Sequence, residues 1–85
     1  MFIAMQIKVF FHSYFRELTG CRETVENLPE GASLGQLLTT LRARFPKLAP
    51  MQKSTLVAVG VEYQTPDYIL GEPDEVSLFP PVQGG

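Results

Sequence analysis

The chain is poor in the residues that most often perform chemistry. Its 85 residues include one cysteine, Cys21, one histidine, His12, and no tryptophan. A single cysteine excludes an internal disulfide and any CxxC metal or redox motif, and one histidine cannot build a metal site alone. The sequence also lacks a G-x-S-x-G nucleophile motif and the glycine spacings of phosphate-binding loops. We therefore expect no metal site and no self-sufficient active site.

Positive charge and long apolar runs are also scarce. Seven Lys and Arg residues face nine Asp and Glu residues, for a formal net charge of -2, so the chain has no basic footprint for nucleic acid. The apolar runs MFIAM and LVAVGV fall far short of the roughly 20 residues that a membrane span needs. No basic flank or cleavage site marks a secretion signal. We expect a cytoplasmic protein without nucleic-acid or membrane partners.

What the chain does contain suits one folded domain. Its composition, 45% hydrophobic and 19% charged, is ordinary for a soluble globular protein and too apolar for a disordered one. Its length also suits one domain, and we see no internal repeat or linker. We predict a domain over residues 1–80 and a flexible tail over 81–85.

The N-terminal part predicts a hairpin. Residues 6–14 are rich in β-branched and aromatic residues that alternate, with Phe10 and His12 on the face opposite to the apolar one. Residues 15–20 indicate a short helical turn that ends at a glycine. Residues 22–28 alternate more weakly and predict a second strand. Cys21, between these segments, is interpreted as a turn or strand residue.

A helix follows with clear start and stop signals. Ser33 is a suitable N-cap, Gln36 completes a capping box three residues later, and Pro46 ends the helix after roughly 12 residues. The arginines near its end suit the helix dipole. The apolar side chains recur with helical spacing and form a stripe that we assign first to the core: Leu34, Leu37, Leu38, Leu41 and Phe45.

The C-terminal half alternates strands and loops. After an irregular stretch around Pro50, residues 55–61 predict a buried strand and residues 62–65 its short neighbour. Residues 66–74 predict a loop with Leu70 as its apolar anchor, and residues 74–79 predict the last strand.

This order predicts an α+β fold of the β-grasp, ubiquitin-like kind. About five strands form a mixed sheet, one main helix covers one face, and the first and last strands are central and parallel. A ferredoxin-like domain is the runner-up. It requires a second helix, and residues 47–72 carry too much proline and glycine to supply one comfortably.

The C-terminal segment PPVQGG suits a group that is delivered elsewhere. Pro80 and Pro81 stop the sheet and stiffen the base of the tail, whereas Gly84 and Gly85 make its tip thin. The only chemical group at the tip is the carboxylate of Gly85, which must be activated to react; adenylation by ATP opens it to attack by sulfur or an amine. The competing interpretation is an accidental or truncated flexible end.

Four segments resemble the small subunit of molybdopterin synthase, the MoaD family of ubiquitin-like sulfur carriers related to ThiS: IKVFFHSYFRELTG, SLGQLLTTLRARFP, LVAVGVEY and DEVSLFPPVQGG. The resemblance implies a role in molybdenum cofactor biosynthesis. Gly85, with Gly84 beside it, would be adenylated by an E1-like enzyme that uses ATP and converted to a thiocarboxylate. It would then donate sulfur to a cyclic pterin precursor in the large subunit of a heterotetrameric synthase. The chain itself would bind no cofactor.

The resemblance also implies a surface that both partners contact. Strand alternation places Phe10, His12 and Phe79 on the sheet face away from the helix, and the family pattern adds Tyr63. His12 departs from the family, which commonly has a hydrophobic residue there, and an exposed phenylalanine can also be incidental. Arg16 matches a family arginine and either pairs with a partner carboxylate or solvates a turn. The predicted partner-binding residues are Phe10, His12, Arg16, Tyr63, Phe79, Pro81 and Val82.

Other functions fit the same tail. A thiamine-type sulfur carrier would use the same thiocarboxylate, a ubiquitin-like modifier would join Gly85 to lysines, and a plain interaction domain would leave the tail idle. The alternatives differ in what Gly85 becomes: a thiocarboxylate, an isopeptide or an unmodified end.

Overall fold

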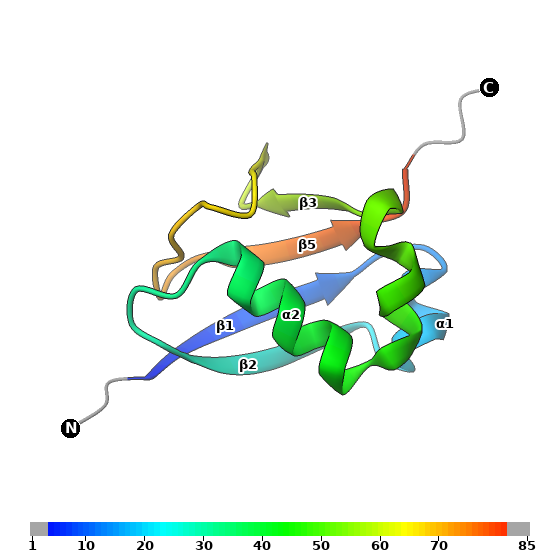
Figure 1. Ribbon diagram of the computed structural model, residues 1–85, viewed down its shortest axis with the longest axis horizontal. Coiled ribbons are helices and arrows are strands. Elements are labelled where there is room, and N and C mark those ends of the chain that lie inside the picture. Colours follow the sequence, from blue (N-terminus) through cyan, green and yellow to red (C-terminus); the bar gives the residue numbers. More distant parts are fainter. Residues whose placement is uncertain (1–3, 82–85) are drawn as a thin grey trace.

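A computed structural model of the chain describes residues 4–81, which form one sheet with helices on one side (Figure 1). The strands are β1 (Ala4–Phe11), β2 (Glu23–Pro29), β3 (Leu56–Val59), β4 (Glu62–Tyr63) and β5 (Glu75–Phe79). The helices are α1 (Phe15–Thr19), α2 (Leu34–Arg44) and the 3-10 helix η1 (Pro46–Ser54). None of the described helices is long and apolar enough to cross a membrane.

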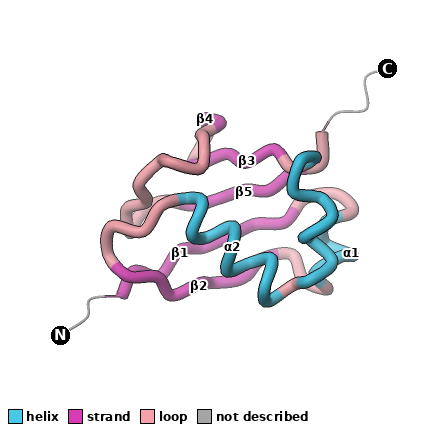
Figure 2. Tube along the Cα trace, in the orientation of Figure 1, coloured by secondary structure: helices cyan, strands magenta, loops and turns pink. Residues whose placement is uncertain are grey.

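The sheet has the order β2-β1-β5-β3-β4, and α2 crosses one of its faces (Figure 2). β1 and β5 are parallel neighbours at the centre, whereas β1 with β2, β3 with β5 and β3 with β4 are antiparallel. This is the predicted β-grasp arrangement, and it is confirmed. The ferredoxin-like alternative fails because residues 47–72 hold η1, two strands and a loop, and no second long α-helix.

The core lies between α2 and the inner face of the sheet. Alternate residues of β1 and β5 point into it, as the period of two predicts. α2 contributes its leucine stripe, and Phe45 caps the helix and meets Phe11 edge to face at 5.5 Å. The largest fully buried side chains are Ile7, Val9, Phe11, Phe15, Leu34, Leu37, Leu41 and Val76.

The start of α2 is satisfied twice over. The Ser33 hydroxyl accepts from the Gln36 N–H at 3.2 Å, and the Gln36 side chain accepts from the Ser33 N–H at 2.8 Å, which confirms the capping box. The backbone N–H groups of Leu34 and Gly35 donate to the carbonyls of Tyr68 and Pro66, respectively, each at 2.8 Å. Both carbonyls belong to the loop that follows β4. Because helix N-termini leave free donors, these bonds fix the loop against α2, where Leu70 is buried as predicted.

The end of the first strand differs from its predicted position at residue 14. β1 ends at Phe11 because Ser13 has a positive φ of 59° and the Phe15 N–H donates to the His12 carbonyl, which turns the chain into α1. The helical turn itself is as predicted, and Gly20 closes it with a φ of 78°.

The stretch after α2 is more regular than predicted. Residues 46–54 form η1, with Pro46 in its first turn and Pro50 inside it. Only Leu48 of this element is buried. A helix with a single buried residue needs no 3.6-residue apolar pattern, so the sequence did not reveal it. Proline is tolerated in a first helical turn, where its missing N–H is not needed.

Candidate functional site

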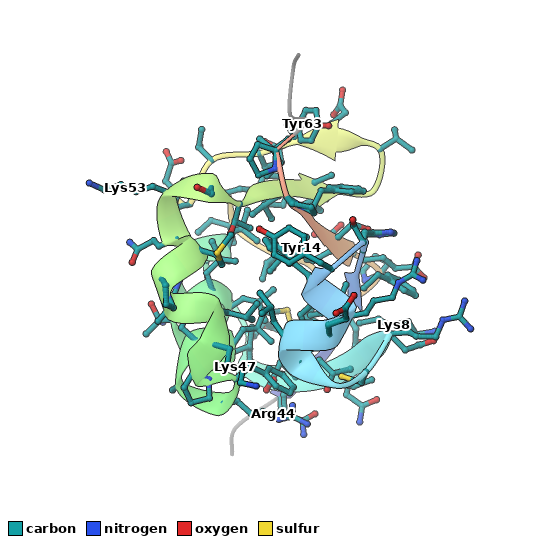
Figure 3. All side chains as sticks on the ribbon, turned by 90° about the vertical axis from the view of Figure 1, so that its right-hand side faces the viewer. Lys8, Tyr14, Arg44, Lys47, Lys53 and Tyr63 are labelled. Carbon is teal, nitrogen blue, oxygen red and sulfur yellow. The ribbon has the colours of Figure 1, made fainter. Side chains whose placement is uncertain are left out.

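The face of the sheet away from α2 carries a row of side chains that spans four strands. The register places Phe10 opposite Ser77, Ser77 opposite Ala58, and Ala58 opposite Tyr63. Directly opposed residues in a sheet point to the same side. Tyr63, labelled in Figure 3, is 68% exposed. The structure thus brings Phe10 and Tyr63 to one face, as predicted.

A second row lies closer to the C-terminal end of β5. Phe79 is opposite Leu56 and stacks on His12, with ring centroids 4.4 Å apart and planes 14° from parallel. The backbone N–H of His12 donates to the Leu78 carbonyl at 3.1 Å, which holds the histidine beside the last strand. We call the surface formed by both rows the outer face; its members are Phe10, His12, Leu56, Ala58, Tyr63, Ser77 and Phe79.

His12 carries an unusual polar atom within this surface. Its Nε2 is buried and has no hydrogen-bond partner among the described residues. A buried polar group without a partner is costly. The ring stacks on Phe79 in a position where Nε2 is shielded from water. The predicted position of His12 on the outer face is confirmed.

Arg16 lies beside the end of β1. Its Nε donates to the Phe11 carbonyl at 3.2 Å, and its side chain is otherwise exposed. It borders a shallow hollow of about 390 Å³ with Phe10, Phe11, His12, Arg22 and Glu23. Arg16 therefore ties down the chain after β1 and presents charge beside the outer face, so both predicted roles remain compatible with its position.

The base of the tail lies next to the second row. Phe79 is the last residue of β5, and Pro80 and Pro81 follow it, both half-buried. Predicted residues Val82, Gly84 and Gly85 lie outside the described residues. The sheet thus ends beside the stacked pair, so the segment toward Gly85 begins at the outer face.

Sequence reasoning missed Leu56 and Ala58 as members of the outer face. The run LVAV is apolar at every position, so its pattern does not tell which side chains face α2. The register resolves it, because Val57 and Val59 oppose the inward residues Leu78 and Val76. A strand paired on both sides shows this continuous pattern when neither of its faces is fully solvated.

The cysteine lies outside this surface. Cys21 occupies the turn before β2, is half-buried, and donates its Sγ–H to the Thr19 hydroxyl at 3.7 Å, in line with its predicted place in a turn or strand. Among residues 4–81, no three His, Cys, Asp or Glu side chains are grouped so as to hold a metal ion.

Comparison with known proteins agrees with this geometry. The ThiS family model matches residues 9–85. The molybdopterin synthase sulfur carrier subunit of Chlamydomonas reinhardtii is 36% identical over 95% of this chain and 100% of its own length. The subunit of the same name from Arabidopsis thaliana is 32% identical over 96% of this chain and 85% of its own.

A solved structure matches as well. The putative molybdopterin converting factor, subunit 1, from Pyrococcus furiosus superposes with a TM-score of 0.85 at 30% identity, covering 92% of this chain and 99% of that one. The family match begins at residue 9, near the end of β1, and extends through residue 85, so it covers β2 to β5, α2 and the Gly-Gly segment. The chain therefore belongs to the ThiS family.

Proposed function

We propose that this chain is the sulfur carrier subunit of a molybdopterin synthase, with Gly85 as the carrier position. The family match and the names of the relatives support this function. The chain has the composition expected of a carrier, with little side-chain chemistry of its own. We propose that it binds no cofactor and that ATP is used by an E1-like partner.

The observation that carries the proposal is the coincidence of the outer face with the base of the tail. Phe79 belongs to the outer face and is followed directly by Pro80 and Pro81. A partner that covers this apolar face is therefore positioned to receive the segment that leads to Gly85. Two consecutive prolines restrict φ at the base of that segment, which lowers the entropy lost when it enters a partner's pocket.

The proposed chemistry takes place at the terminal carboxylate in two steps. In the first, a carboxylate oxygen of Gly85 attacks the α-phosphorus of ATP and pyrophosphate leaves, which gives an acyl-adenylate. In the second, hydrosulfide attacks the acyl carbon and AMP leaves, which gives a thiocarboxylate. Neither step changes an oxidation state. Glycine at this position leaves the acyl carbon unhindered, because it has no Cβ.

The outer face would serve two partners in turn, the adenylating enzyme and the large synthase subunit. Both must reach the same chain end, so both are expected to cover Phe79 and the neighbouring apolar side chains. Interfaces of this kind concentrate binding energy in buried aromatic residues. Tyr63 and Phe10, with Phe79, are the candidates for those positions, and Arg16 would pair with a carboxylate at the rim.

Intact-mass measurement tests the proposal directly. The chain is incubated with an E1-like enzyme, ATP and sulfide, and we expect a mass gain equal to the replacement of one oxygen by sulfur. The matched control lacks Gly85 and should show no gain. The thiocarboxylate form, mixed with large subunit and the cyclic pterin precursor, should then yield molybdopterin.

Three results would contradict the proposal. Adducts of higher mass joined through lysine would indicate a modifier, and a thiocarboxylate that supports thiazole formation without molybdopterin formation would indicate a thiamine-type carrier. An unmodified chain with every adenylating enzyme tried would indicate an idle tail.

A further inference from the structure

A groove beside α2 borders the outer face at Leu56 and Tyr63, and its other lining residues have no role in the proposed sulfur transfer. It has a volume of about 310 Å³ and lies between α2, η1 and the β3–β4 hairpin. Leu34, Leu38 and Arg42, successive residues on one side of α2, line one wall, and Val57 and Gln64 lie on the opposite wall. We propose that this groove binds an extended peptide segment of a partner protein, one that carries an apolar side chain followed two residues later by a carboxylate.

The backbone of β4 is the first reason. β4 is the edge strand of the sheet and pairs only with β3. Gln64 donates its N–H to the Val57 carbonyl at 3.2 Å, and Tyr63 is opposite Ala58. In an antiparallel ladder, residues alternate between pairs that exchange hydrogen bonds and pairs whose backbone groups point outward. The N–H and C=O of Tyr63 therefore face the open side, where a peptide strand can pair with them.

The spacing of the helix wall is the second reason. Leu38 and Arg42 are four residues apart, which is about 6 Å along an α-helix. Every second residue of an extended peptide lies on the same face, about 6.6 Å apart. The two spacings are similar, so one inward side chain can lie near Leu38 and Gln64 while the next lies near Arg42, all of which line the groove.

Charge is the third reason and selects a carboxylate. Arg42 is half-buried in the groove wall, and within residues 4–81 it has no carboxylate at ion-pair distance. The other groove residues with polar side chains, Gln52, Thr55, Tyr63 and Gln64, carry no charge at neutral pH. A guanidinium in a partly dry wall binds a carboxylate by short charge-assisted hydrogen bonds.

At the opposite edge of the sheet, an ion pair joins α2 to the edge strand. There the neighbouring arginine of α2, Arg44, bonds Glu26 of β2 at 2.5 Å and reaches the Val25 carbonyl at 3.4 Å. The guanidinium thus bridges α2 to the β2 edge and occupies one of its free carbonyls. Arg42, two residues earlier, has no carboxylate partner in the part of the chain that the structure describes, so its guanidinium can pair with a ligand on this side of α2.

The test uses two synthetic peptides and the full chain labelled with ¹⁵N. The first probe is acetyl-Thr-Val-Thr-Ile-Thr-Glu-Thr-amide, and the second has Lys in place of Glu. We expect saturable amide shifts at Leu38, Arg42, Val57 and Tyr63 with the Glu peptide, and slower hydrogen exchange at the Tyr63 N–H.

Charge reversal separates a specific groove from general attraction. Arg42→Glu should lower the affinity of the chain for the Glu peptide by about tenfold or more. The same variant should bind the Lys peptide more tightly than the parent chain does. The matched control, Lys47→Glu, makes the same change of charge at an exposed η1 residue that does not line the groove, and should change the affinity by less than about twofold. The amide spectrum of each variant shows whether it is folded.

Several outcomes would overturn the proposal. These are shifts that do not saturate, shifts confined to Phe10 and Phe79 on the outer face, or equal weakening by the two variants. Groove shifts that depend on protein concentration without peptide would instead assign the groove to a second copy of the chain. Thiocarboxylate formation by Arg42→Glu is measured separately and should match the parent, so failure here leaves the proposed sulfur transfer untouched.

Discussion

His12 and Phe79 stack face to face, with ring centroids 4.4 Å apart, and thereby join the chain after β1 to the last residue of β5. The two strands are already parallel neighbours, so the stack extends their pairing by one more contact beyond the sheet. It lies directly before Pro80. The first residues of the tail therefore begin from a fixed point on the outer face.

Replacing Phe79 should weaken partner binding far more than it weakens the fold. Phe79→Ala removes a half-buried ring that we place at the centre of the interface, and we expect a loss of about 10- to 100-fold in affinity for the large synthase subunit. Isothermal titration calorimetry with purified subunits measures it. Ile69→Ala, which truncates an exposed loop residue away from the outer face, is the control, and an equal loss there would contradict the assignment.

Replacing His12 by phenylalanine should stabilise the chain. The His12→Phe side chain keeps the stack on Phe79 and removes the buried Nε2 that lacks a partner. An unsatisfied buried polar group costs about 1–3 kcal/mol. We therefore expect the free energy of unfolding, measured with urea, to rise by up to about 1 kcal/mol. His12→Ala, which loses the stack as well, should be less stable than the parent. A less stable His12→Phe would mean that Nε2 has a partner in solution.

Removing Gly85 should abolish thiocarboxylate formation with little effect on stability. Gly85 has no side chain that could fill a core, and chain ends are often tolerant of change, so we expect the fold to remain stable. One residue added after Gly85 should have the same effect, because it moves the carboxylate away from Gly85. Thermal unfolding and intact mass measure the two properties on the same samples. A large drop in melting temperature on either change would show that the tail is part of the fold.

The sequence predicted most of the framework because the framework is built from local and periodic signals. The capping box of Ser33 and Gln36, the leucine stripe of α2 and the alternation along β1 each express a single element's geometry. The parallel pairing of β1 and β5 was predicted from the order of the elements along the chain, because a helix between strands implies a crossover connection.

The rest depended on pairing between distant segments. The inward direction of Val57 is set by its register with Leu78, which an all-apolar run cannot reveal. The stack of His12 on Phe79 and the partnerless Nε2 likewise arise only when β1 and β5 are brought together. η1 lacks the apolar period that would have revealed it.

Breaking the ion pair between Glu26 and Arg44 should destabilise the fold. The Glu26 carboxylate side chain is 8% exposed and that of Arg44 is 49% exposed. Arg44→Met leaves the buried carboxylate unpaired, and we expect a loss of about 1–2 kcal/mol in urea unfolding, reduced from the value for a fully buried pair by the solvent around Arg44. The double variant with Glu26→Gln should recover most of the loss. No recovery would mean that Arg44 acts through packing on Phe45, over which its guanidinium lies at 5.2 Å.

The contact between Tyr68 and Asp74 should appear in the alkaline titration of the tyrosines. The negative charge of Asp74 and, to a smaller extent, desolvation raise the pKa of the Tyr68 phenol above its ordinary value. A group with a raised pKa in the folded state stabilises that state below its unfolded pKa, and the stabilisation is lost as pH rises through the folded pKa. For tyrosine this window lies above about pH 10.

Asp74→Asn isolates this effect. The amide oxygen can still accept from the Gly71 N–H, which the carboxylate holds at 2.8 Å, while the charge is lost. Tyrosinate absorbance followed against pH should then show one of the three tyrosines titrating at lower pH than in the parent. Glu72→Gln, an exposed neighbour that is not among the groups shifting Tyr68, should leave the curve unchanged. If Asp74→Asn also leaves the curve unchanged, the Tyr68 phenol is solvated and the charge of Asp74 does not act on it.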